Sequence, residues 1–83
     1  MLFHITQTHN PESCPKNDGG SKILYNADVA GLKLVALYGA YSEHEIYFIV
    51  EADSMEAVNK FLDPGLTRCT SIITPVVSKP IER

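Results

Sequence analysis

The feature that most constrains the fold is the alternation of four strand-like segments with two helix-like segments within 83 residues. Residues 2–9 alternate between two sets of side chains, and this period of two predicts a strand. Leu32–Tyr41 is a near-continuous apolar run that predicts a second strand. A turn at Ser42-Glu43 leads into a third strand at Glu45–Ala52, and a fourth is expected at about Thr67–Val77.

Two helices are expected between these strands. The first covers Ser21–Ala30, with Ser21 as its N-cap and Gly31 as its C-terminal stop. Asp53 or Ser54 caps the second, which ends at Pro64-Gly65 and has Glu56 as a capping-box partner for Asp53. Its helical spacing predicts a buried stripe formed by Met55, Val58, Phe61 and Leu62.

The order βαββαβ predicts an α+β fold of the ferredoxin-like type, with a four-stranded antiparallel sheet and both helices on one face. One domain is expected over residues 1–78, followed by a loose tail at 79–83. The other face of the sheet is left bare, and a small domain has a marginal core. We therefore expect a homodimer in which two sheets form an α+β barrel.

Composition argues against two classes of partner. The net charge is −3 and the basic residues do not cluster, so nucleic-acid binding is not expected. No apolar stretch approaches the roughly 20 residues that span a bilayer, so no membrane partner is expected. The N-terminus does not resemble a signal peptide. A cytoplasmic protein is the default expectation, with Cys14 and Cys69 as free thiols.

Two segments resemble a known family. His9-Asn10-Pro11-Glu12-Ser13-Cys14-Pro15 and the stretch Tyr47–Ser54 are similar to segments in a family of short proteins of unknown function. That family looks like part of the dimeric α/β-barrel group. The resemblance covers roughly Met1–Val77 and implies the barrel fold and a dimer. It brings no established catalytic residues.

Four potential metal ligands are expected at one end of the sheet. The first strand should lie between the third and fourth, so the end of strand one meets the start of both neighbours. His9 ends strand one, His44 opens strand three and Cys69 opens strand four, while Cys14 lies in the long loop Asn10–Gly20. Two imidazoles with one or two thiolates suit zinc or copper. Ordinary strand-end roles for these residues are the alternative.

His4 belongs to a different group. Five residues of extended chain span about 16 Å and reverse the side-chain direction, so His4 and His9 should not share an ion. If His9 lies opposite His44, then Thr8 pairs with Glu45 and Thr6 with Tyr47. His4, Glu45 and Tyr47 then lie on the face away from the helices, which would line the barrel interior.

Three functions remain open at this point. The first is a metal-binding protein that uses His9, Cys14 and His44, with Cys69 as an optional fourth ligand. The second is a small-molecule-binding or isomerase- or monooxygenase-like barrel enzyme, in which His4 acts as acid–base group and Tyr47 and Glu45 position the ligand. The third is a plain interaction module whose dimer is the functional unit. Whether the protein is an enzyme is left open.

Overall fold

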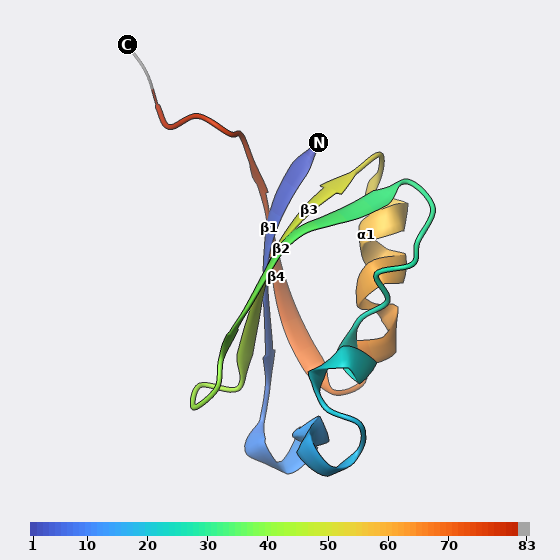
Figure 1. The fold of residues 1–83 in the computed structure, drawn as a ribbon, viewed down its shortest axis with the longest axis vertical. Helices are drawn as coiled ribbons and strands as arrows, with labels where there is room; N and C mark the ends of the chain where they lie inside the picture. The colour runs from blue at the N-terminus through green and yellow to red at the C-terminus, as the bar shows by residue number, and fades with distance from the viewer. Residues whose placement is uncertain (82–83) are drawn as a thin grey trace.

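A computed structural model describes residues 1–81 and shows one antiparallel sheet with its helical segments on one side (Figure 1). The strands are β1 (Leu2–His9), β2 (Leu32–Ala40), β3 (Glu45–Ala52) and β4 (Cys69–Val76). Their order across the sheet is β2-β3-β1-β4, so β1 lies between β3 and β4 as predicted. The architecture is α+β and consistent with the ferredoxin-like plait.

The predicted register of β1 against β3 is confirmed. Thr8 pairs with Glu45 and Thr6 with Tyr47, and the apolar residues Ile5 and Phe48 lie opposite each other. Every second residue of β1, from Phe3 to His9, is buried. This alternation places one set of side chains under the helical segments and leaves His4, Thr6 and Thr8 on the open face.

A β-bulge interrupts the pairing of β2 with β3. Leu34 pairs with Val50, but Ala36 pairs with Ile49, so Val35 is an extra residue on β2. The bulge reverses which residues of β2 face the helical side. Before it, Leu32 and Leu34 pack against the core; after it, the even-numbered residues lie on the open face.

The helix after β3 forms as expected, with two differences in detail. Helix α1 (Met55–Leu62) is capped by Ser54, whose hydroxyl accepts a hydrogen bond from the N–H of Ala57 at 3.2 Å. The cap is therefore Ser54 and not Asp53, and the expected Asp53–Glu56 capping box is wrong. Met55 is 46% exposed, so it is not part of the buried stripe. Ala57 is buried instead, beside the three predicted residues Val58, Phe61 and Leu62.

The expected first α-helix is wrong in extent. Only Ser21–Leu24 is helical, as a 3₁₀ helix, and the chain then runs in non-helical conformation to β2. Two contacts explain this. Asn26 Oδ1 accepts the N–H of Asp28, a local bond that competes with helix formation, and the N–H of Asn26 donates to the Phe61 carbonyl at 2.8 Å. Further 3₁₀ turns occur at Pro11–Ser13, Pro15–Asn17 and Asp63–Gly65.

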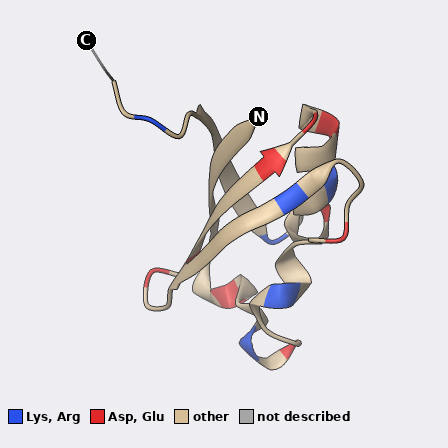
Figure 2. Cartoon of the chain, turned by 45° about the horizontal axis from the view of Figure 1, so that its top comes forward, with Lys and Arg blue, Asp and Glu red and all other residues tan. Residues whose placement is uncertain are grey.

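The core lies between the sheet and these helical segments. Leu24 is fully buried, and Phe48 and Phe61 meet edge to face with ring centroids 4.9 Å apart. The remaining buried apolar residues are Phe3, Ile5, Ile46, Val50, Ala52, Ala57, Val58 and Leu62. No helix in residues 1–81 is long and apolar enough to cross a bilayer. Lys and Arg are scattered singly over separate elements (Figure 2).

The segment after β4 leads away from the sheet (Figure 1). Residues 77–81 form no helix or strand. The expected tail spans 79–83, and its last two residues lie outside the described part of the chain.

Among the five glycines, Gly65 leaves the least room for a side chain. We therefore predict that Gly65→Ala is destabilising. A Cβ there would lie 2.6 Å from the Leu24 carbonyl oxygen and 2.8 Å from Gln7 Nε2. Because a backbone atom must move, the free energy of unfolding should fall by about 1–3 kcal/mol in urea denaturation. Gly39→Ala is the control, since a Cβ at Gly39 meets nothing within 4 Å. Equal loss in both variants would contradict the packing argument.

Candidate metal site

Two histidines meet where β1 ends beside the turn between β2 and β3. His9 is the last residue of β1 and is 8% exposed on the helical side of the sheet. His44 closes the turn, with its N–H donating to the Tyr41 carbonyl at 3.3 Å. The N–H of His9 donates to the His44 carbonyl at 3.1 Å, which confirms that the two residues lie opposite each other.

His44 has an unusual backbone conformation. Its φ is 55°, and it is the only non-glycine residue with positive φ among residues 1–81. This left-handed conformation costs a residue with a Cβ about 1–2 kcal/mol. Such strain at a polar residue is typical of functional sites, where surrounding structure maintains it.

Cys14 lies in a loop that consists of short turns. The residue lies between the 3₁₀ turns Pro11–Ser13 and Pro15–Asn17, and its N–H donates to the Pro11 carbonyl at 3.2 Å. The Pro15 carbonyl accepts the N–H groups of Asp18 and Gly20. An ion pair of 3.2 Å joins Asp18 to Arg68, which immediately precedes β4. The loop is thus tied back to the sheet beside His9.

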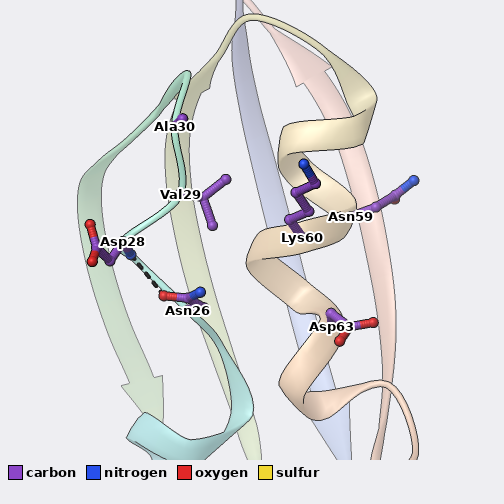
Figure 3. Close-up of a pocket in the computed structure, with 7 residues that line it drawn as sticks. All are labelled: Asn26, Asp28, Val29, Ala30, Asn59, Lys60 and Asp63. Atoms are coloured by element: carbon purple, nitrogen blue, oxygen red, sulfur yellow. Dashed lines mark hydrogen bonds between the residues drawn. The ribbon is translucent and has the colours of Figure 1, made fainter.

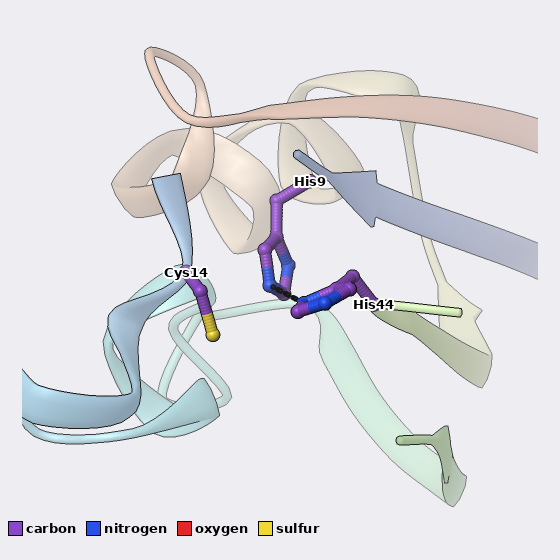
Figure 4. A group of neighbouring side chains, drawn as sticks. All are labelled: His9, Cys14 and His44. Atoms are coloured by element: carbon purple, nitrogen blue, oxygen red, sulfur yellow. Dashed lines mark hydrogen bonds between the residues drawn. The ribbon is translucent and has the colours of Figure 1, made fainter. Parts of the chain in front are cut away.

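The three side chains form a compact group (Figure 4). His9 Nε2 and His44 Nδ1 share a hydrogen bond of 3.1 Å, and the two rings are nearly perpendicular, at 80°. The ligand atoms of His9, Cys14 and His44 all lie within 4.8 Å of one another. In Figure 4 the side chain of Cys14 lies beside the two rings. This arrangement can hold a metal ion.

The environment keeps His9 in the form that binds metals. Burial lowers the pKa of His9, and His44 and Arg68 nearby lower it further. The ring is therefore neutral at neutral pH, with a lone pair to offer. His9 Nδ1 is buried with no hydrogen-bond partner among the described residues. An unpaired buried N–H costs about 1–3 kcal/mol, which limits affinity relative to sites where a carboxylate or carbonyl accepts it.

Cys69 stays outside the group of three. It pairs with His9 across the β1–β4 ladder, as expected, but a Cβ built on Gly65 would lie 3.3 Å from its sulfur, and its side chain packs against the core. Burial raises the pKa of the Cys69 thiol, which disfavours the thiolate that a metal needs. Cys69, the optional fourth ligand, is therefore not part of this cluster.

His4, Tyr47 and Glu45 share the open face of the sheet. The rings of His4 and Tyr47 are stacked at 6.3 Å between centroids, and the Tyr47 hydroxyl donates to Glu45 Oε1 at 2.6 Å. Thr8 donates to the other carboxylate oxygen at 3.3 Å. The bond to Glu45 raises the pKa of Tyr47, and burial and the charges of Glu45 and Glu43 add to this. A catalytic role for this set remains a prediction.

A cavity of about 590 Å³ is lined in part by the histidine–cysteine group. It lies between the loop that carries Cys14 and the turn that carries His44, and its lining includes Lys16, Gly39 and Glu45. Sequence reasoning did not identify Lys16 or Gly39 as site residues. The available signal was Gly39, because a glycine inside a strand often marks the close approach of a ligand.

A second cavity, of about 410 Å³, lies between residues 26–30 and α1 (Figure 3). Asp28 and Asp63 line it, but their side chains point to opposite sides. It gathers no set of ligand atoms comparable to the histidine–cysteine group.

Comparisons of the chain with protein-family models, curated proteins and solved structures find no match. The resemblance to a family of dimeric barrels therefore remains a prediction. The chemistry of the site has to be argued from its own geometry.

The contact between Tyr47 and Glu45 gives a testable titration. Glu45→Gln removes the charge and the carboxylate acceptor, so the pKa of Tyr47 should fall toward the ordinary tyrosine value of about 10. NMR of ¹³Cζ-labelled tyrosine over a pH series measures this directly. Glu51→Gln is the matched control on the same strand and should leave Tyr47 unchanged. An unchanged pKa in Glu45→Gln would show that the bond is absent in solution.

Proposed function

We propose that the protein binds one transition-metal ion per chain, zinc in the first place, through His9 Nε2, Cys14 Sγ and His44 Nδ1. The observation that carries the proposal is the 3.1 Å separation of the two ring nitrogens, with the cysteine sulfur within 4.8 Å. Nitrogens bound tetrahedrally to zinc at 2.0–2.1 Å are about 3.3 Å apart. The pair is therefore already close to ligand spacing.

Little movement would complete the site. A sulfur and a nitrogen on tetrahedral zinc are about 3.5 Å apart, so Cys14 would have to approach by at most about 1.3 Å. A change of side-chain rotamer supplies such a shift. The donor set of two imidazoles and a thiolate also suits copper, so the identity of the metal is decided by competition between the two ions.

The strain at His44 supports this function over a purely structural role. A histidine in the left-handed conformation is less stable there than glycine would be. A need for the imidazole accounts for a histidine at this position. Two free thiols in one chain also fit the cytoplasm, which we propose as the location.

Zinc binding is tested with two ligand variants and one matched histidine control. Chain purified without chelator should contain one zinc, and Cys14→Ser or His44→Asn should lower zinc affinity by more than about 100-fold, beyond typical outer-shell effects. His4→Gln should bind as the parent does, because His4 lies on the other face. Metal content and competition with a chromophoric chelator measure this. Affinity that is unchanged in both ligand variants would refute the proposal.

The same series separates function from folding. Because asparagine tolerates positive φ, His44→Asn should leave the metal-free protein at least as stable as the parent. Zinc at 100 times its dissociation constant should stabilise the parent by about 2.7 kcal/mol and the variant far less. A variant that simply unfolds would instead lose stability without metal.

We further propose that a second copy of the chain covers the open face of the sheet. All helical segments lie on the other side, and the open face exposes large side chains: Ile72 is 64% and Tyr38 is 69% exposed. A small domain gains stability by burying such a surface.

Sedimentation velocity at micromolar concentration tests the dimer. The parent should sediment as a dimer, and Ile72→Lys should weaken association at least tenfold because an unpaired charge would be buried. Leu66→Lys is the control, since Leu66 is similarly exposed, at 72%, but lies outside the sheet. A monomeric parent would rule out the dimer.

A further inference from the structure

Three protein ligands leave one position on a tetrahedral ion unfilled. Structural zinc sites have four protein ligands, whereas three ligands and an open position are typical of sites that bind a substrate or water. The described residues supply only His9, Cys14 and His44 to the group. His9, Cys14 and His44 also line the cavity of about 590 Å³, so a small molecule in that cavity would lie beside an ion held by these residues.

The cavity has the size and lining of a small-molecule site. Its volume lies within the 300–1,000 Å³ range of ligand pockets, and its lining is mainly apolar, with Pro15, Ala40 and Ile46 among its residues. Gly39 keeps it open, since a Cβ at that position would meet nothing within 4 Å. Glycine is otherwise unfavourable within a strand.

The charges around the cavity favour an anion. Zinc bound by one thiolate and two neutral imidazoles carries one net positive charge. Lys16 is the only basic residue lining the cavity apart from the histidines, and it makes no ion pair within residues 1–81. Glu45 is the only carboxylate there, and both of its oxygens already accept hydrogen bonds.

We propose that the cavity binds a small organic monocarboxylate whose oxygen takes the fourth position on the metal and whose charge is balanced by Lys16. This inference rests on the proposed metal site and adds the class of ligand to it. A carboxylate offers an oxygen donor that zinc accepts. A single lysine and a largely apolar lining suit one negative charge on an apolar body better than a phosphate dianion.

The experiment uses the full chain loaded with cobalt(II), which replaces zinc and makes the coordination visible. Benzoate is the probe, and neutral benzamide is its matched control. Cobalt alone should produce visible absorption bands of a four-coordinate site with a thiolate ligand. Benzoate should then shift these bands saturably, and benzamide should not.

Two variants test whether the benzoate response arises from binding in the cavity. Gly39→Val should place three carbons in the cavity and weaken the benzoate response while leaving the cobalt bands of the metal alone unchanged. Lys16→Met should weaken benzoate binding about fivefold, the size expected of an exposed ion pair. Neither residue belongs to the proposed ligand set, so both proteins should load with metal as the parent does.

The two proposals fail in different ways. Absence of cobalt bands in the parent would overturn the metal site and this inference together. Normal cobalt bands that do not respond to benzoate, or respond equally to benzamide or in Gly39→Val, would overturn the carboxylate site alone. Benzoate binding to the metal-free parent with unchanged affinity, measured by ligand-observed NMR, would also overturn it.

Discussion

The backbone ladder between β1 and β3 is the constraint on which the rest of the structure depends. It separates the buried side chains of β1 from the open face, and it ends where the N–H of His9 bonds to the carbonyl of His44. A shift of one residue would move His9 to the open face and put His4 into the core. The histidine–cysteine group therefore exists only in the register that also buries Ile5 and Phe48.

Much of this framework could be predicted from the chain itself. The bounds of β1 follow from alternation, those of β3 follow from the turn before it and the capped helix after it, and their register follows from matching apolar residues on one face. The first helix could not be predicted, because helical spacing at Ser21–Ala30 is overridden by the turn at Asn26 and its bond to Phe61. Local patterns do not contain that tertiary contact.

The candidate site was predictable to a similar degree. His9 and His44 are strand-end residues, so sheet order alone brings them together. Cys14 could be placed only near them, since its position depends on the succession of 3₁₀ turns and on the Asp18–Arg68 ion pair. Cys69 shares a ladder position with His9, but its sulfur lies beside Gly65, a packing detail that strand geometry does not specify.

The β-bulge at Val35 has a consequence at the far end of the hairpin. With the bulge, Ala40 pairs with Glu45, and four residues, 41–44, form the turn. If β2 kept the pairing of Leu34 with Val50 throughout, Ala40 would instead face His44, and His44 would be an ordinary strand residue. One added residue near the start of the hairpin thus places His44 in the turn and not in the strand. The length of one strand here determines the backbone position of a histidine several residues away.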